Sequence, residues 1–393
     1  MCTRSSRTLG SAVAALALIP LATSGTAETK TPLVHKTKYI MGTVYEIAAY
    51  DDSPAHASAA IDKAFAEIVY LDGLLSNFKP DSALSRLNRE GHLRAVKVPA
   101  DLYRVIEESL KYSKLSDGKF DITVAPLVDL WKAALRGERV PTAEEQAKAR
   151  TCVGYEKVKL IPPDQVQFES PCMRIDVGSI GKGYAVDRAA EILRANGIQN
   201  ALVDAGQSSI YAMGAPPGQA AWEVHLRDPS GRIDPVVMLR ENSVSTSEQT
   251  PPSLLGNATA GHIIDPENGK PLETKYALSV VVKTGTASDA LSTTLLLVGP
   301  EKGKTIVKAL PNAAAIWVSA AGETETVSTG PEIRVRNAER GASAEKRLAG
   351  NVVFSRHSER SQGLCAIARL LRDESLVVAA KKRDSSLCGL RSE

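Results

Sequence analysis

The chain has 393 residues, of which 48 are lysine or arginine and 45 are aspartate or glutamate. This near balance of charge provides no broad basic field for a nucleic-acid backbone, so nucleic acid is excluded as an expected partner. The length is sufficient for one large domain or two ordinary domains with a sizeable core.

The first residues have the order of a secretory signal. Arg4 and Arg7 precede a mainly apolar stretch from Leu9 to Leu21, and small residues follow at Gly25-Thr26-Ala27. The apolar stretch is too short to cross a hydrocarbon core, which requires about 20 residues. Cys2 lies at the wrong end of the stretch for a lipid anchor. The sequence therefore predicts a cleaved signal over residues 1–27 and a soluble periplasmic protein.

The first half of the mature chain alternates strand and helix patterns. Thr37 to Tyr50 is rich in β-forming residues, which predicts a strand. Apolar residues from Ile61 to Leu75 and from Asp101 to Leu115 have helical spacing, so each segment is expected to be a helix with one face in the core. Phe120 to Trp131 mixes polar and apolar residues, which is typical of a packed loop followed by a short helix.

A β-meander is expected from Tyr155 to Asp176, where short alternating pieces are separated by a turn cluster. Cys152 and Cys172 flank this segment, and an oxidising compartment could join them in a disulfide. No spacing of cysteine and histidine resembles a zinc site. A helix is predicted from about Gly183 to the Asn196-Gly197 stop signal.

The second half is predicted to be richer in strands. Helices Ser288 to Leu297 and Glu301 to Ala309 are expected between its last two strands. Helices segregated around a mixed, mostly antiparallel sheet indicate the α+β class. Residues 28–333 are therefore interpreted as the folded domain, and residues 334–393, which contain few aromatics, as a basic, poorly packed C-terminal extension. The strands are predicted at residues 201–205, 222–226, 236–239, 278–282 and 313–318.

The stretch from Asp176 to Asp187 contains the strongest local signal for a ligand. Its glycines end a strand and begin a helix, whose N-terminus offers N–H groups to an anion, and Lys182 adds a positive charge suited to phosphate. The alternative interpretation is a tight strand-to-helix turn with no ligand. The glycine spacing matches neither a Walker A loop nor a Rossmann fingerprint.

Two further segments carry polar side chains in suggestive positions. Asp289 and Thr293 are four residues apart and share one face of a predicted helix, where they could offer oxygen ligands to Mg²⁺. The alternative is that Ser288 or Asp289 is a helix N-cap. His262 and Asp265 flank a short strand, and a lone histidine of this kind is more often structural.

In this order, the segments resemble the FAD:protein FMN transferase family, also called the ApbE family. The resemblance extends from Met41 to about Gly303. It rests on Met41-Gly42-Thr43, Ser76 to Ser82, Ser85 to Asn88, Gly118 to Leu127, Asp176 to Asp187, His262 to Gly269, and Ser288 to Thr293.

The resemblance implies an α+β enzyme that holds FAD in a cleft and uses a metal, usually Mg²⁺, to cleave the pyrophosphate. FMN would be joined through a phosphoester to a Thr or Ser hydroxyl of a client redox protein, typically a membrane-associated one, with release of AMP. The residues that match the family's metal site are Ser179, Thr286, Asp289 and Thr293, some acting through backbone carbonyls. The residues that match its FAD site are Met41, Phe78, Lys119, Phe120, Asp121, Asp176, Lys182 and Ile264.

Within this scheme Lys182 is expected to assist electrostatically, and His262 is the candidate base because an unperturbed imidazole has a pKa of about 6.5. The chain departs from the family pattern at Gln207, where a second glycine is usual. A second departure is Glu248, which places bulk and negative charge where the family has glycine in a region expected to face flavin. Two alternatives stay open: an FAD pyrophosphatase that uses water as acceptor, and a non-catalytic flavin-binding assembly protein.

Overall fold

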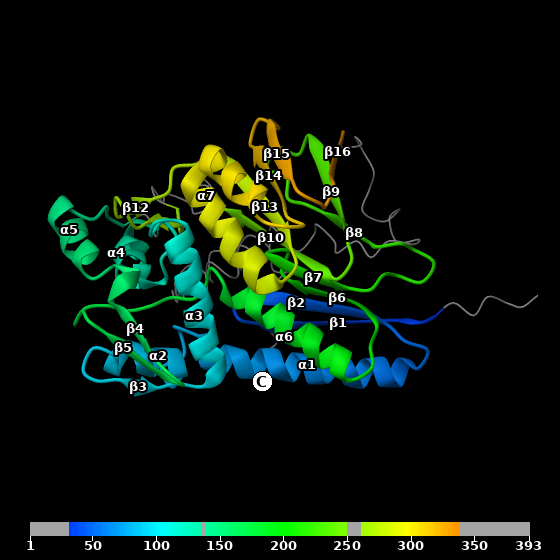
Figure 1. Ribbon diagram of the computed structural model, residues 1–393, viewed down its shortest axis with the longest axis horizontal. Helices are drawn as coiled ribbons and strands as arrows, with labels where there is room; N and C mark the ends of the chain where they lie inside the picture. The colour runs from blue at the N-terminus through cyan, green and yellow to red at the C-terminus, as the bar shows by residue number, and fades with distance from the viewer. Residues whose placement is uncertain (1–30, 136–137, 250–260, 338–393) are drawn as a thin grey trace, which may run out of the picture. The chain divides into compact units, whose positions relative to one another are not determined.

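The computed structural model describes residues 31–135, 138–249 and 261–337 (Figure 1). The predicted signal and most of the predicted C-terminal extension lie outside these residues. Among the residues described, no helix combines the length and the apolar character needed to cross a membrane.

An eight-stranded sheet lies at the centre of the fold, and each of its strands pairs antiparallel with its neighbours. The strands predicted in the second half of the chain are found, and the α+β class is confirmed. In spatial order the strands are β1 (Leu33–Ile40), β2 (Thr43–Tyr50), β6 (Asn200–Ala205), β7 (Ser209–Met213), β10 (Asn242–Glu248), β13 (Tyr276–Val282), β14 (Ala314–Ser319) and β15 (Thr324–Ser328).

The prediction of one strand from Thr37 to Tyr50 was wrong, because the chain reverses within it. β1 ends at Ile40 and β2 begins at Thr43, and the two residues between them, Met41 and Gly42, have φ of 51° and 78°. Two central residues with positive φ make the tight hairpin turn that matches the twist of the flanking strands. Methionine rarely occupies such a position, so the composition concealed the turn.

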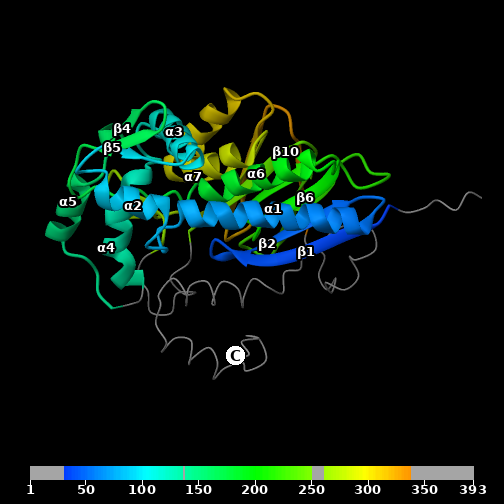
Figure 2. The same ribbon diagram turned by 90° about the horizontal axis from the view of Figure 1, so that it is seen from below.

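Helices cover one face of the large sheet and a second sheet covers the other (Figures 1 and 2). Both faces are therefore buried: Val280 packs on the helical side, whereas its neighbour Val281 packs against the second sheet. Successive residues of a strand point to opposite faces, so a sheet covered on both faces needs apolar residues at every position. This explains the continuous apolar run of β14. The covering elements are α1 (Pro54–Leu75), α6 (Gly181–Ala195) and α7 (Gly285–Lys308) on one face, and β8 (Trp222–His225), β9 (Ile233–Leu239) and β16 (Ile333–Asn337) on the other.

The two helices predicted between the last strands are the two halves of α7. Gly299 has φ 77° and ψ 171° and interrupts the helix immediately before Pro300. At the other end of this region, β16 pairs with β9 from Ile333 to Asn337. The residues from Arg334 to Asn337 therefore belong to the fold, although the sequence assigned them to the extension.

A smaller group of elements packs beside the helical face. The predicted meander is β4 and β5, and β3 joins it from an earlier part of the chain. Cys152, at the end of α5, forms a disulfide with Cys172, so that pairing is confirmed. The elements are α2 (Ala83–Glu90), β3 (Val96–Lys97), α3 (Ala100–Leu115), η1 (Ile122–Val124), α4 (Ala125–Leu135), α5 (Ala143–Thr151), η2 (Tyr155–Lys157), β4 (Val158–Ile161), β5 (Gln165–Phe168), β11 (Ile264–Asp265) and β12 (Lys270–Pro271).

Candidate active site

The N-terminal ends of α6 and α7 touch through their backbones. A Cβ atom on Gly183 would lie 2.1 Å from the carbonyl oxygen of Gly285, and one on Gly285 would lie 2.5 Å from that of Gly183. Any side chain at either position would separate the helices. The glycines therefore serve helix packing at this point, in addition to the turn predicted from the sequence.

Each of the two helices caps the other with a carboxylate. Asp289 of α7 accepts the N–H of Gly183 at 2.8 Å and also that of Lys182. In return, Asp187 of α6 accepts the N–H groups of Gly285 and Thr286 at 2.6 and 2.8 Å. Negative charge at a helix N-terminus is stabilised by the helix dipole. The exchange fixes the positions of the two helix ends relative to each other.

This exchange corrects one expectation. The sequence left the N–H groups at the start of α6 open for a phosphate, whereas Asp289 occupies those of Lys182 and Gly183. Burial raises the pKa of Asp289, and the charge of Lys182 opposes that rise. The Lys182 ammonium itself donates only to the carbonyl of Gly178, at 3.2 Å, among the contacts described. Phosphate recognition here would therefore fall to that ammonium.

The predicted metal ligands lie around this junction and differ in their hydrogen bonding and exposure. The Thr286 hydroxyl donates to Asp187 at 2.6 Å, which commits its proton and leaves the hydroxyl lone pairs and the backbone carbonyl as possible oxygen ligands. Thr293 lies one turn beyond Asp289 and is partly exposed, while Ser292 and Thr294 beside it are buried. Ser179 lies half-buried in the turn that precedes α6.

The turn from Asp176 to Lys182 is tied to two other matched motifs. Asp176 donates its N–H to the carbonyl of Ile122 at 2.7 Å and accepts the N–H of Gly178 through its side chain at 2.7 Å. Next to it, Asn88 bonds the backbone of Ile175 and the side chain of Asn77. Segments that are distant in the sequence are thereby held at one place.

The residues matched to the FAD site fall into two groups. Met41 lies near the start of α6, where its methyl carbon is 3.8 Å from the Cβ position of Gly181, and Tyr45 donates a hydrogen bond to its sulfur at 3.3 Å. Phe78 is 50% exposed. The second group, Lys119, Phe120, Asp121 and Ile264, lies around the loop between α3 and η1 and the β11–β12 hairpin.

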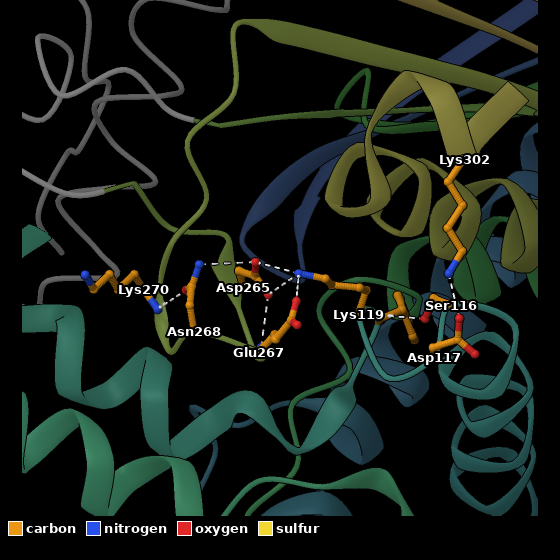
Figure 3. Close-up of polar contacts among 9 residues, drawn as sticks. Ser116, Asp117, Lys119, Asp265, Glu267, Asn268, Lys270 and Lys302 are labelled. Atoms are coloured by element: carbon orange, nitrogen blue, oxygen red, sulfur yellow. Dashed lines mark hydrogen bonds and ion pairs between the residues drawn. The ribbon is translucent and has the colours of Figure 1, made fainter.

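Lys119 is the central cation of this second group (Figure 3). Its ammonium lies 2.8 Å from the carboxylate of Asp265 and also pairs with Glu267. Lys119 and Asp121 line a pocket of about 760 Å³, together with Arg150, Glu267 and Lys302 among other residues. This volume is in the range of small-molecule sites.

Three matched residues have side chains that are already engaged within the protein. Phe120 is 1% exposed and packs edge-on against Tyr112 in the core, and Ile264 belongs to a small apolar cluster with Trp131. The Asp121 carboxylate accepts hydrogen bonds from Thr123 and from the N–H of Tyr155, and burial raises its pKa to about 6. For Phe120 and Ile264, only the backbone atoms are therefore available to a ligand.

His262 immediately precedes β11 and its hairpin. Although the residue has an exposed surface, the surrounding protein desolvates its charged form and, with the charge of Lys182, lowers its pKa to about 4. The imidazole is therefore neutral at pH 7 and able to accept a proton, but as a weak base. The reason given from the sequence, an ordinary pKa near neutrality, does not hold.

The two departures from the family pattern lie in a turn and on a strand. Gln207 follows Gly206 in the β6–β7 turn, where both residues have positive φ, 60° and 63°, and glycine is the natural choice there. Glu248 pairs with Arg227 at 2.8 Å. Because neighbouring strand residues point to opposite faces and Ser247 bonds α7, Glu248 points away from α7.

Comparison with known proteins decides the family. The ApbE family model matches residues 41–317, and the FAD:protein FMN transferase of Klebsiella pneumoniae is 31% identical over 294 residues, covering 72% of this chain and 82% of that protein. The chain belongs to the ApbE family. The prediction of a transferase enzyme is confirmed with it.

Other members of the ApbE family support the same assignment. The FAD:protein FMN transferase of Treponema pallidum is 29% identical over 303 residues, covering 72% of this chain and 83% of that protein. The flavin transferase ApbE of Vibrio cholerae superposes with a TM-score of 0.66 at 25% identity, covering 76% of this chain and 98% of that one. The apo flavinyl transferase ApbE of Pseudomonas stutzeri gives 0.66 at 29% identity, covering 76% and 95%.

Sequence reasoning missed several residues that shape the site. The sequence analysis gave no role to Asp187, Ser209 or Ser247. Ser209 forms a hydrogen bond with Asp289, and the hydroxyl of Ser247 lies 3.1 Å from that of Thr293. A signal for Ser247 was present. Serines alternate at positions 243, 245 and 247 of a strand, which is the pattern of a polar sheet face.

Proposed function

We propose that this protein transfers FMN from FAD to a Thr or Ser hydroxyl of a client protein, with Mg²⁺ as the cation and AMP as the product. The observation that carries the proposal is the junction of α6 and α7, where Lys182, Asp289 and Thr293 meet in a member of the ApbE family. A phosphate-binding cation, a buried carboxylate and an accessible hydroxyl on facing helix ends are parts that phosphoryl transfer requires.

The donor set at the junction fits Mg²⁺. Asp289 and Thr293 present hard oxygens one helical turn apart, which is the ligand type this ion takes. In the described part of the chain, no group of three or more His, Cys, Asp or Glu side chains is placed to hold a metal. That fits an ion that keeps water and substrate phosphates among its ligands. When bound, the ion neutralises charge on the pyrophosphate oxygens.

The remaining roles follow from exposure and charge. The Lys182 ammonium would bind a phosphate oxygen, and the exposed ring of Phe78 would stack on the flavin. His262, neutral at pH 7, would accept the proton of the client hydroxyl as that oxygen attacks the phosphorus bonded to the leaving AMP.

The test is to incubate the protein without residues 1–27 with FAD, Mg²⁺ and a peptide bearing the acceptor pattern Asp-Gly-x-Thr-Ser-Ala-Thr, and to follow adduct mass and AMP. An FMN-sized adduct with equal AMP is expected. Asp289→Asn, which retains an oxygen for the Gly183 N–H but removes the charge, should abolish both products. AMP without adduct would instead indicate an FAD pyrophosphatase, and neither product despite FAD binding would indicate a non-catalytic protein.

We also propose that the enzyme acts in the periplasm on a membrane-associated redox protein. The signal-like N-terminus and the Cys152–Cys172 disulfide support this location, because such bonds persist in oxidising compartments. Fractionation of cells that produce the full chain would test it. Recovery of unprocessed protein with both thiols free in the cytoplasm would contradict the proposal.

A further inference from the structure

The strand β10 packs against α7 (Figure 1). Three of its serines, at positions 243, 245 and 247, face that helix. Ser243 and Ser245 both contact Ser288, with oxygens 2.9 and 2.7 Å apart. At the end of the row, Ser247 contacts Ser292 at 2.8 Å and Thr293 at 3.1 Å. The last serine thus touches the hydroxyl that we assign to the cation site.

When the three contacts around Ser247 and Ser292 form together, counting protons gives the direction of each hydrogen bond. A hydroxyl has one proton to donate and two lone pairs that accept. Ser292 donates its proton to the carbonyl of Asp289 at 2.9 Å, so Ser247 is the donor in its bond to Ser292. With the Ser247 proton committed there, Thr293 is the donor in the remaining bond.

We propose that Ser247 is a positioning residue for the cation: it accepts a hydrogen bond from Thr293 and leaves the lone pairs of that hydroxyl directed away from β10, toward the face of α7 that Thr293 shares with Asp289. This proposal rests on the proposed function of the site. It gives a reason why the Thr293 hydroxyl would face the cation when the Thr294 hydroxyl turns to its own helix backbone.

The neighbouring threonine shows what happens without such a partner. The Thr294 hydroxyl donates to the carbonyl of Ala290, four residues earlier, at 2.8 Å. This back-bonding is the usual choice of a hydroxyl inside a helix. In a Ser247→Ala variant, Thr293 would be free to turn to the carbonyl of Asp289 in the same way, and its lone pairs would no longer be held toward the cation.

The test measures binding of Mn²⁺, as a paramagnetic substitute for Mg²⁺, to the full folded protein by electron paramagnetic resonance, with and without FAD. Loss of a group that orients a metal ligand typically weakens metal binding 10- to 100-fold, so we expect Ser247→Ala to weaken it about tenfold. Ser247→Thr, which restores the hydroxyl, should recover most of the affinity. The matched control is Ser243→Ala, the same change on the same face of β10 without contact to Thr293, and it should bind like the wild type.

A kinetic readout separates positioning from general damage. The Mg²⁺ concentration for half-maximal AMP release should rise about tenfold in Ser247→Ala, with kcat at saturating Mg²⁺ largely retained. Unchanged Mn²⁺ affinity in Ser247→Ala, or equal losses in both alanine variants, would overturn the proposal. If the wild type binds Mn²⁺ and the variants behave as expected but no FMN adduct forms, only the transfer function fails. A wild type that binds no divalent cation would overturn both.

Discussion

His262 is the residue whose environment changes its expected chemistry most. Because its pKa is lowered to about 4, the neutral form persists down to that pH. If it is the base, its contribution to transfer should be flat from pH 8 to 5 and be lost as the pH falls through about 4. A histidine with an ordinary pKa would lose this contribution to transfer as the pH falls through about 6.5.

His262→Ala is expected to lower the rate of FMN transfer by about 10²-fold, the lower range for removal of a general base, with FAD affinity retained. Single-turnover adduct formation at saturating FAD and client measures the rate, and fluorescence titration measures FAD binding. An unchanged transfer rate would remove the assigned role.

Asp204 is a buried carboxylate whose ionisation the fold opposes. It lies directly across from Glu46 on the neighbouring strand and accepts the N–H of Gln207 at 2.6 Å, and burial raises its pKa to about 7. An unfolded aspartate titrates near about 4. The folded state therefore holds this proton more tightly, so the stabilisation is complete below about pH 4 and is lost as the pH rises toward 7.

Asp204→Asn retains an oxygen for Gln207 and cannot ionise. It should therefore gain stability relative to the wild type between pH 4 and 8, on the order of 4 kcal/mol at the upper end. Urea unfolding at a series of pH values gives both curves. Parallel curves over this range would show that the Asp204 carboxylate is not protonated in the fold.

At the scale of elements, the contact between α6 and α7 is the feature on which the site depends. Gly183→Ala would place a methyl group 2.1 Å from the Gly285 carbonyl and 2.5 Å from the Cβ of Asp289. Overpacking of this kind costs about 1–3 kcal/mol. The helices would have to separate, and the Asp289 bond to Gly183 would lengthen. We expect the variant to unfold at lower urea and to lose flavin transfer.

Gly73→Ala is the matched control, because Gly73 lies within α1 and its Cβ position has no atom within 4 Å. Alanine is favoured over glycine in helices by roughly 0.5–1 kcal/mol, so this variant should be more stable than the wild type. Opposite signs for the two substitutions are the expected result. A neutral Gly183→Ala would show that the helix junction tolerates separation.

At the scale of the whole molecule, the Cys152–Cys172 disulfide ties the end of α5 to the segment that leads into Asp176. The two cysteines are 20 residues apart. Closure of a loop of this length stabilises a fold by about 3 kcal/mol through the unfolded chain. Cys172→Ser should therefore lower the free energy of unfolding by that order, and a reductant should destabilise the wild type but not the variant. Equal stability with and without reductant would contradict this.

The sequence alone determined the helices with long apolar periodicity, the break in α7 at Gly299-Pro300, the α+β class and the family. These depend on spacing and turn residues that are close together along the chain, or on the order of several motifs. The hairpin at Met41 was missed because a methionine at positive φ is stable only when two paired strands hold it there.

Only the tertiary structure decided how the site is assembled. Three contacts in the site join residues that are far apart in sequence. They are the backbone contact of Gly183 with Gly285, the reciprocal capping of the two helices by Asp187 and Asp289, and the hydrogen bond between Thr293 and Ser247. It also placed the ring of Phe120 in the core, where its side chain cannot meet a ligand. Local sequence gives the type and periodicity of a side chain. The direction of that side chain, its partners and the protonation it can hold are set by packing with distant segments, which no local pattern contains.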